Sequence, residues 1–525
     1  MKFKKTIACV GVAVLLVTVA ACGGKGGPAE NGASKPSSSP SSSEGAAETA
    51  KPKVSMKIMG EFASSNLSET DKLLVKSIEE ATNTEIKFDI PPSTGYTERL
   101  QLALTTGELA DVVWFPSPDD AAFLKAVKDG VIVPIDEYLE GAENIQKYSY
   151  DVSWDALRVN GDGKVYGIPR TTVIRSDGYW FRKDWLDKLN IQLPENNEIT
   201  LDQMIEIMYK FSKEDPDDNG KHDTYGYGWA MQPDKSLRPV FQNEQGLYGW
   251  QESDGGEYKY MNPQYDLNSD KYTKALDLTA KLFKEGVIDP DGPTIDGSKA
   301  LERFQSGKTG VIDGFAGHYE TFLNAGKQIN PNFELVYVFV KNEQGEMKGL
   351  GQGTGLWGFW AITSSAKEPQ RVVDVFNYML SDEGWDSIYT GIEGHDYKVE
   401  NNKRVYAEQP LETFVRKNMV RRANDYMFFI NPAISEELKQ ILVPNIEKAV
   451  KRIVMSKDRN FTPAIAKTPP YLDFNKKFSE VTTKIIIGDA QSSEYKEVLQ
   501  DWNAKFGQTY LKEMNDYIDQ MENKK

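Results

Sequence analysis

The order of hydrophobic patterns between residues 54 and 115 restricts the fold more than any other feature of the sequence. Three short stretches carry strand-like patterns, and two stretches between them place apolar residues at helical spacing. The expected strands are 54–60, 85–90 and 111–115, and the expected helices are 67–81 and 96–106. This alternation is typical of a parallel, doubly wound α/β sheet. Ligands of such sheets bind outside the carboxyl ends of the strands.

Later parts of the chain continue the α/β pattern. Further strands are expected at 179–181, 309–313, 335–340 and 356–362, and further helices at 183–189, 201–211, 272–284 and 371–380. From about Pro410 helical patterns dominate. At about 150 residues per domain, 525 residues suggest three or four units, although a two-lobed body also fits.

The composition excludes two classes of protein. An aromatic content of 11% is too high for a disordered chain. The net charge of −16 argues against a nucleic-acid-binding protein, which normally carries a basic patch.

The first 22 residues carry the pattern of an export signal. Lys2, Lys4 and Lys5 precede the mostly apolar stretch 7–21, which is too short to be interpreted first as a membrane-spanning helix. Small residues stand directly before Cys22, and the pattern resembles the lipobox of bacterial lipoproteins. The resemblance implies a signal peptide at 1–21, cleavage after Ala21, and acylation of Cys22 with palmitate-type chains. The alternative is an ordinary secretory signal in which Cys22 stands by chance.

Residues 22–53 are predicted to be a flexible linker on this lipid anchor, because they are rich in Gly, Ser, Pro and Ala. Cleavage would remove three lysines and no acid, and would change the net charge from −16 to −19. Both cysteines, Cys9 and Cys22, lie in the first 22 residues, so the body contains neither a disulfide nor a thiol nucleophile.

The segment 215–226 has the spacing of a calcium-binding loop. Oxygen-bearing side chains stand at its first, third, fifth and ninth positions, and a glycine stands at the sixth, as in an EF-hand loop. The proposed ligands are Asp215, Asp217, Asn219, the carbonyl of Lys221, and Asp223. Gly226 replaces the usual bidentate Glu, so Thr224 or a neighbouring segment must complete the shell. An acidic turn without metal is the alternative, and a bound calcium ion would have a structural role.

Candidate ligand-binding residues follow from side-chain chemistry. Arg170 ends a short strand after the glycine-rich turn 160–167, and an arginine there can hold hydroxyls or a carboxylate, although a hairpin with a charged tip has equal support. Flat aromatic faces match the apolar faces of sugar rings, and the candidates in or beside predicted strands are Trp114, Trp357 and Trp360. Asp313 and His318 complete the candidate set.

Catalytic motifs are scarce. The three histidines are far apart in the sequence, and neither an H-E-x-x-H motif nor a G-x-S-x-G motif is present. A glycoside hydrolase needs only two carboxylates, and the 78 acidic residues leave that possibility open.

Seven segments, taken in order, resemble the extracellular solute-binding proteins (family 1) of ABC importers, in their LipO-like lipoprotein group. They are 55–60, 104–113, 162–170, 181–186, 215–226, 282–290 and 380–384. The resemblance implies a two-lobed periplasmic-binding-protein-like fold of type II, with a ligand cleft between lobes joined by hinge strands. The first lobe is expected at 54–170 with about 311–365 returning to it. The second is expected at 171–310 with the helical region of about 366–525.

The resemblance also implies the function. A monomer on the outer face of the bacterial cell membrane, held there only by its lipid, would capture an oligosaccharide and deliver it to an ABC permease without catalysing a reaction. Calcium-binding relatives carry an acid at the tenth loop position, where Thr224 stands here. A lipid-anchored glycoside hydrolase and a peptide-binding importer component remain alternatives.

Overall fold

The computed structural model describes residues 53–61, 66–232, 236–351, 353–407, 413–459 and 461–523. All of them belong to one compact unit, Pro52–Lys525. The expected signal peptide, Cys22 and nearly all of the linker lie outside the described residues.

The first five-stranded sheet confirms the predicted strand–helix alternation. Its order is β2 (Thr84–Asp89), β1 (Val54–Met59), β3 (Val112–Phe115), β13 (Leu356–Ile362) and β4 (Ile168–Thr171). β1 runs parallel to β2 and β3, whereas β13 runs antiparallel to both β3 and β4. The antiparallel strand is therefore the one that comes from late in the sequence.

The second five-stranded sheet follows the same plan. Its order is β6 (Glu198–Thr200), β11 (Leu335–Lys341), β5 (Gly178–Arg182), β10 (Thr309–Gly314) and β7 (Tyr225–Tyr227). β5 is antiparallel to β10 and β11, while the other pairs are parallel. In each sheet, the antiparallel strand is the one that arrives directly from the other sheet.

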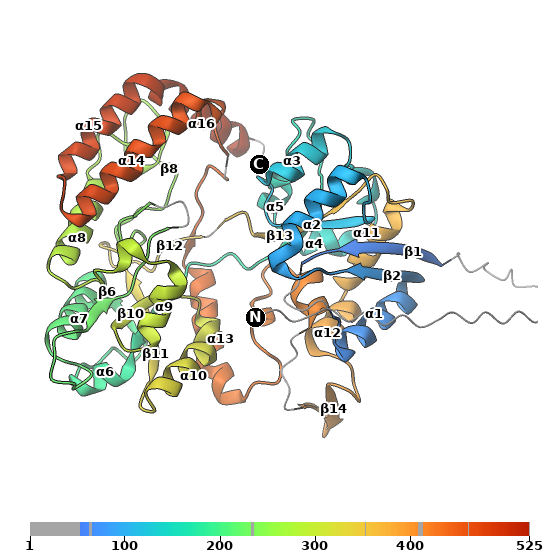
Figure 1. Ribbon diagram of the computed structural model, residues 1–525, viewed down its shortest axis with the longest axis horizontal. Coiled ribbons are helices and arrows are strands. Elements are labelled where there is room, and N and C mark those ends of the chain that lie inside the picture. The colour runs from blue at the N-terminus through green and yellow to red at the C-terminus, as the bar shows by residue number, and fades with distance from the viewer. Residues whose placement is uncertain are drawn as a thin grey trace, which may run out of the picture. The chain divides into compact units, whose positions relative to one another are not determined.

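Helices cover both sheets (Figure 1). Those around the first sheet are α1 (Glu69–Thr82), α2 (Ser93–Thr106), α3 (Ala121–Lys128), α4 (Glu143–Lys147), α5 (Asp151–Ala156), α11 (Pro369–Met379) and α12 (Asp382–Thr390). α1 begins with a capping box, in which the Ser68 hydroxyl accepts from the Asp71 amide and the Asp71 carboxylate accepts from the Ser68 amide. The Asp71 carboxylate also accepts from the amides of Phe414 and Val415, which ties a late segment of the chain to the start of α1.

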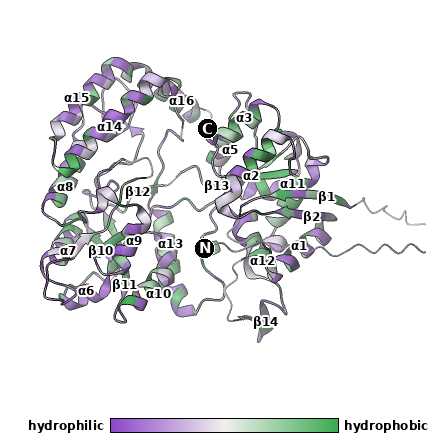
Figure 2. Ribbon diagram, viewed as in Figure 1, coloured by the Kyte–Doolittle hydropathy of each residue, from purple (hydrophilic) through white to green (hydrophobic). Residues whose placement is uncertain are grey.

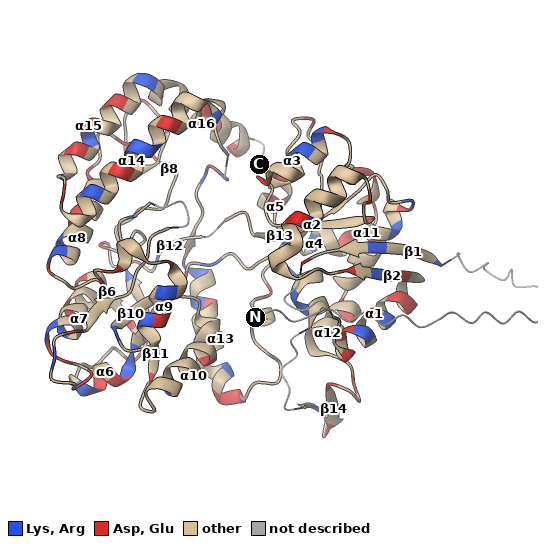
Figure 3. Ribbon diagram, viewed as in Figure 1, with Lys and Arg blue, Asp and Glu red and all other residues tan. Residues whose placement is uncertain are grey.

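The helices around the second sheet include all the described α-helices from Glu436 onward. They are α6 (Lys183–Lys188), α7 (Leu201–Lys213), α8 (Lys271–Lys284), α9 (Gly297–Gln305), α10 (Tyr319–Ile329), α13 (Glu436–Lys451), α14 (Pro469–Ile487), α15 (Ser492–Trp502) and α16 (Gln508–Glu522). Hydrophobic and hydrophilic residues alternate along α14, α15 and α16, as expected for helices that bury one face (Figure 2). Acidic and basic residues are likewise interspersed on these helices (Figure 3).

Short elements complete the fold. Three two-stranded pairs are β8 (Gln251–Glu252) with β9 (Tyr260–Met261), β12 (Gly349–Leu350) with β16 (Ile453–Val454), and β14 (Tyr397–Glu400) with β15 (Lys403–Tyr406). Single turns of 3₁₀ or π-helix are η1 (Asp136–Tyr138), η2 (Pro263–Tyr265), η3 (Gly292–Thr294), η4 (Ala316–His318), η5 (Val415–Met419), η6 (Tyr426–Phe429), η7 (Ala464–Lys467) and η8 (Asn503–Gly507).

The cores differ from the predicted lobe boundaries in two places. β10 and β11 pair within the second sheet, so only β13 returns to the first, and the predicted return at about 311 was too early. α11, α12 and the segment 413–428 pack into the core of the first sheet rather than the second, whereas α14 to α16 pack with the second as expected. The reason is physical: a buried strand or helix has the same apolar pattern in either core, and long-range packing decides which it joins.

Three segments connect the two cores within the described residues. The first links β4 to β5, the second links β12 to β13, and the third follows Phe428 into the core that contains Ile430 and α13. The first segment bonds to the second, where Thr172 N donates to Gly355 O at 2.8 Å, and to α13, where Ser176 N donates to Ala449 O at 2.9 Å. A buried ion pair lies beside these segments, with Arg452 Nη2 at 3.4 Å from Glu244 Oε1.

Candidate ligand-binding site

Trp357 is an exposed aromatic residue of the first lobe. It stands at the start of β13, where the pairing with β4 shifts register between Leu356 and Phe359. Gly358 causes the shift with a φ of 75°, a conformation that a residue with a Cβ adopts only at a cost. Trp357, next to this glycine, is 51% exposed. Trp357, one of the predicted ligand-binding residues, therefore lies at an accessible end of its strand.

Glycines near Trp357 allow side chains to contact the backbone closely. The Trp114 indole lies against Gly358, where an added Cβ would be 2.6 Å from Cε2. The Tyr150 ring lies against Gly355 in the same way, at 2.5 Å from the position that a Cβ would occupy. Gly355 and Gly358, on either side of Trp357, therefore serve packing within the chain.

Two of the predicted ligand-binding tryptophans belong to the core instead. Trp360 is 1% exposed, donates from Nε1 to Met419 O at 2.7 Å, and packs on Phe376. Trp114 is 8% exposed and packs edge-on against Tyr96. Strand residues alternate between the two faces of a sheet, and the sequence pattern did not tell which face would be covered by helices.

Arg170 is buried at the end of β4 and holds Trp357 in place. The guanidinium is 3% exposed, and its Nη1 donates to Trp357 O at 2.6 Å. Nη2 donates to Lys417 O and, at 3.3 Å, to Asn418 Oδ1. Burial lowers the pKa of Arg170, and the carboxylate of Glu61 opposes that shift. Arg170 thus fixes the backbone of β13 and of η5 at the edge of the first sheet.

Arg421 stacks directly on Trp357. Its guanidinium carbon lies 3.7 Å from the centre of the indole, and that of Arg170 lies 5.2 Å from the same ring. Burial lowers the pKa of Arg421, and the charges of Arg170, Arg416 and Arg175 lower it further. No local motif in the sequence marks Arg421, because it comes from a segment of irregular structure more than sixty residues after Trp357.

The second lobe contributes a hollow at the end of β10. It has a volume of about 620 Å³, and its walls include Trp229, Gln232, Asp296, Ile312 and Asp313. The Asp313 carboxylate accepts a hydrogen bond from the Tyr227 hydroxyl at 2.9 Å. Asp313 is exposed to solvent in the hollow. Protein atoms nevertheless surround its carboxylate closely, and this partial removal from water raises its pKa. The prediction of Asp313 therefore matches a polar group that a ligand can reach.

His318 and two charged residues lie near Asp313. Arg175 pairs with Asp177 at 2.9 Å and stacks on Phe315 at 4.0 Å, and the His318 ring packs edge-on against the same phenylalanine. Burial and the charge of Arg175 lower the pKa of His318. Burial raises the pKa of Asp177, to which Asp313 adds. The pKa values of Asp177 and His318 therefore both depend on the charge of Arg175.

The charge of Arg175 influences the pKa of residues in or beside both lobes. Arg175 lies on the first connecting segment and acts on both Arg421 in the first lobe and Asp177 beside the second. Glu61, after β1, has its pKa raised by burial, against the influence of Arg170.

The acidic loop 215–223 carries oxygen atoms that could bind a metal ion, but several of them accept hydrogen bonds from within the loop. Asn219 Nδ2 donates to Asp217 at 2.8 Å and to Asp223 at 3.0 Å, while Asp215 accepts from the amides of Asn219 and Gly220. Burial and the neighbouring Asp215 and Asp223 raise the pKa of Asp217. Carboxylates that approach one another in this way fit the chemistry of a hard cation.

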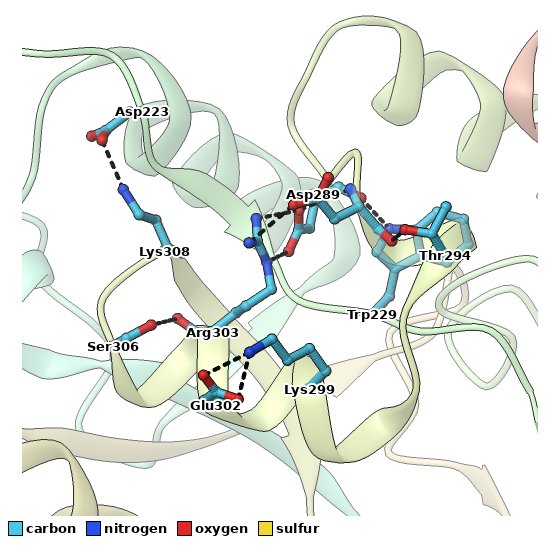
Figure 4. Close-up of polar contacts among 10 residues, drawn as sticks. Asp223, Trp229, Asp289, Thr294, Lys299, Glu302, Arg303, Ser306 and Lys308 are labelled. Carbon is cyan, nitrogen blue, oxygen red and sulfur yellow. Dashed lines mark hydrogen bonds and ion pairs between the residues drawn. The ribbon is translucent and has the colours of Figure 1, made fainter.

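Two contacts count against a complete shell. Thr224 donates its hydroxyl to Phe211 O at 2.8 Å inside the protein, so it does not complete the set as expected. Asp223 is already paired with Lys308 at 2.7 Å, beside the separate pair of Arg303 and Asp289 (Figure 4). Over the described residues, no three His, Cys, Asp or Glu side chains are arranged to hold a metal ion.

No helix among the described residues is long and apolar enough to cross a membrane.

Comparisons with known proteins agree on the family. Residues 64–384 match the model of the bacterial extracellular solute-binding proteins. The polygalacturonan/rhamnogalacturonan-binding protein YtcQ of Bacillus subtilis is 23% identical over 463 residues, which are 85% of this chain and 88% of that protein. Lipoprotein LipO of the same organism is 24% identical over 486 residues, or 88% and 92% of the two chains.

Solved structures agree on the fold. The alginate-binding protein AlgQ2, solved without calcium, superposes with a TM-score of 0.60 at 18% identity, over 89% of this chain and 98% of that one. FusA of Streptococcus pneumoniae in complex with kestose gives 0.59 at 18% identity, over 90% and 100%. The predicted two-lobed α/β fold of the periplasmic-binding-protein type is therefore confirmed. Because the family model covers more than half of the sequence, the chain belongs to the bacterial extracellular solute-binding protein family.

Proposed function

We propose that this protein captures an oligosaccharide and delivers it to the permease of an ABC importer. The observation that carries the proposal is the exposed Trp357 ring in the first lobe, together with the polar hollow around Asp313 in the second. A flat indole packs on the apolar face of a sugar ring, while carboxylates and amides bind its hydroxyls. The names of YtcQ and FusA, which bind polysaccharides or fructooligosaccharides, support this ligand class.

Within this proposal the ligand binds between Trp357 and the hollow formed by Trp229, Asp296 and Asp313. The carboxylate of Asp313 accepts from sugar hydroxyls, and Tyr227 fixes its orientation. His318 and Arg175, which both pack on Phe315, complete the proposed binding surface. Arg170 acts indirectly, because it is buried and holds the backbone of Trp357 in place. Trp114 and Trp360 support β13 from the core.

Capture uses domain closure and no chemistry. The lobes are joined by three connecting segments, and the ligand favours the closed arrangement because it contacts both lobes there. The permease would then recognise the closed form. The family and its relatives are binding proteins, and the protein is proposed to have no catalytic activity. It is proposed to act as a monomer.

A lipid anchor would keep the protein at the outer face of the cell membrane. Acylation of Cys22 is the proposed attachment, and the relative LipO is named a lipoprotein. Mass spectrometry of the protein from a bacterial membrane fraction tests this attachment. A mature N-terminus at Cys22 carrying acyl chains is expected, and an unmodified Cys22 would refute the anchor.

A structural calcium ion in the loop 215–223 is a further proposal. The converging carboxylates of Asp217 and Asp223 support it, and the ion would hold the turn between α7 and β7. Calcium should raise the melting temperature of the chelator-treated protein, and Asp217→Asn should abolish the rise. A melting temperature indifferent to both chelator and calcium would refute it.

A panel of oligosaccharides and peptides tests the main function. Calorimetry should detect binding of at least one oligosaccharide, with the sugar recovered intact afterwards. Binding of peptides alone would favour a peptide-binding importer component. Release of shorter sugars would instead favour a glycoside hydrolase, which needs two carboxylates such as those near the hollow.

A further inference from the structure

An ion pair with a buried carboxylate lies beside the hollow of the second lobe. It joins Asp289, in the loop 285–296 between α8 and α9, to Arg303 of α9 (Figure 4). We propose that Asp289 and Arg303 are positioning residues, which hold the wall of the hollow in the shape that binds the sugar. This inference rests on the proposed function and adds to it two residues that act through others.

The loop after Asp289 forms part of the lining of the hollow. Residues 294–296 line it from this loop, and Gly297 and Ala300 line it from α9. Another part of the lining is the segment 228–232, which follows β7. Apart from the single turn η3, neither the loop 289–296 nor this segment belongs to a helix or a named strand. Contacts between individual groups must therefore fix their geometry.

Asp289 joins the loop to the segment after β7 through its main chain. Its amide donates to Tyr227 O at 3.0 Å, and its carbonyl accepts from Trp229 Nε1 at 2.7 Å. The same carbonyl accepts from Gly292 N at 3.2 Å, and Met231 N donates to Gly292 O at 3.0 Å. The orientation of the Asp289 backbone therefore determines where the Trp229 indole lies.

The Trp229 indole is closely packed and follows its hydrogen-bond partner. It lies against Gly292, where an added Cβ would be 2.2 Å from Nε1, and it packs edge-on against Phe283 with the ring centres 6.1 Å apart. Its side chain is buried, yet it contributes to the lining of the hollow. A shift of the Asp289 carbonyl would leave the buried N–H without its partner or force the ring to move with it.

Arg303 fixes the side chain of Asp289. The carboxylate is fully buried and accepts from both Nε and Nη2 of Arg303, the latter at 2.8 Å. A bidentate pair of this kind sets the relative orientation of the two groups. The carboxylate also accepts from Asp291 N at 3.1 Å, and Arg303 Nη1 lies 3.0 Å from the Asp291 carboxylate. Because a buried carboxylate is costly unless it is paired, loss of the arginine should release Asp289 from this position.

The pair also ties the two ends of the wall together. Asp289 stands before the lining residues 294–297, and Arg303 stands three residues after Ala300 on α9. The stretch 289–303 is therefore closed by the pair, with those lining residues inside it. Asp296, which begins α9 by accepting from Lys299 N at 2.9 Å, belongs to this closed stretch. Its carboxylate is held toward the hollow only while the loop and the helix keep their relative position.

Fluorine NMR of the full chain labelled with 5-fluorotryptophan follows Trp229 directly. The Trp229 resonance is identified as the one that is missing from Trp229→Phe. The test variants are Asp289→Asn and Arg303→Lys, of which the second keeps the charge but loses the planar fork. Lys299→Gln is the matched control, because Lys299 lies on the same helix but pairs with Glu302 at 2.7 Å instead (Figure 4).

Both test variants should move the Trp229 resonance and weaken sugar binding. Calorimetry with kestose, maltotriose and trigalacturonate measures the affinity. For each sugar that binds the native chain, the expected loss is about tenfold, since partners that orient metal ligands change affinity by about 10- to 100-fold. Lys299→Gln should leave both the resonance and the affinity unchanged.

An unmoved Trp229 resonance in the test variants would overturn the inference. So would native affinity in both of them, even with a lower melting temperature, because the pair would then have a purely structural role. If Asp289→Asn does not fold, Arg303→Lys decides the matter, since Arg303 is partly exposed and its charge is kept. If none of the three sugars binds the native chain, the proposed function fails for them, and the Trp229 resonance decides the inference by itself.

Discussion

Replacing Gly358 by alanine should destabilise the first lobe more than any exposed position in it. Gly358 has a φ of 75°, and a Cβ there would overlap the Trp114 indole, with Cε2 at 2.6 Å and Cζ2 at 2.7 Å. Trp114 cannot yield easily, because it packs against Tyr96, whose hydroxyl donates to Trp114 O at 2.6 Å. The substitution therefore combines backbone strain with overpacking.

The two terms can be separated. A residue with a Cβ in the left-handed region costs about 1–2 kcal/mol, and overpacking a core costs about 1–3 kcal/mol. Together they predict a loss of about 2–5 kcal/mol in the free energy of unfolding. Gly353→Ala is the matched control, because Gly353 has a φ of 67° in the same connecting segment but nothing within 4 Å of its Cβ position.

Urea unfolding followed by tryptophan fluorescence measures both variants. Gly353→Ala should lose only the backbone term, and Gly358→Ala should lose about 1–3 kcal/mol more. The more destabilised variant should also bind its oligosaccharide more weakly, because Trp357 immediately precedes Gly358 in the chain. Equal losses in the two variants would refute the assignment of Trp114 as the residue that requires glycine.

Three further predictions concern the site and the connection between the lobes. Trp357→Ala should weaken oligosaccharide binding about tenfold in calorimetry without changing urea unfolding, since the side chain is half exposed; a change in unfolding alone would contradict its binding role. Asp313→Asn should stabilise the protein at neutral pH and lose that gain as the pH falls to about 4. The raised pKa of Asp313 means that its ionised form weakens folding, so the penalty grows as pH rises from the unfolded pKa through the raised folded one. A gain that persists in acid would contradict this. Arg459→Gln removes the ion pair with Asp155, which joins α5 of the first lobe to the segment before α14 at 2.9 Å. It should change stability by no more than about 1 kcal/mol and alter ligand affinity through the closure equilibrium; identical affinity in both proteins would assign the pair no role in closure.

Local pattern was sufficient for the elements of the first sheet. The expected strands at 54–60, 85–90 and 111–115 correspond to β1, β2 and β3, and the expected strand at 356–362 corresponds to β13. Apolar spacing reports which residues are buried within an element, and that information is contained in about ten neighbouring residues. It contains nothing about the partner of the element. The strands at 309–314 and 335–341 were therefore recognised but assigned to the wrong lobe.

The same limit applies to the candidate site. Trp357 and Asp313 were predicted from side-chain chemistry beside strand ends, and both can be reached from solvent. Trp360 had the same signal but faces the core, three residues after Trp357 in the same strand. Arg421 had no signal at all, because its significance comes from stacking on a residue that is distant in sequence.

The sequence by itself determined the α/β class, the strand–helix order of the first lobe and the kinds of side chain available for a sugar. The tertiary structure alone decided which core each late element joined and which of the candidate side chains remained exposed. It also brought Arg170, Arg421 and Trp357 together. Periodicity along the chain encodes burial, whereas partner choice and the gathering of charges depend on contacts between residues hundreds of positions apart.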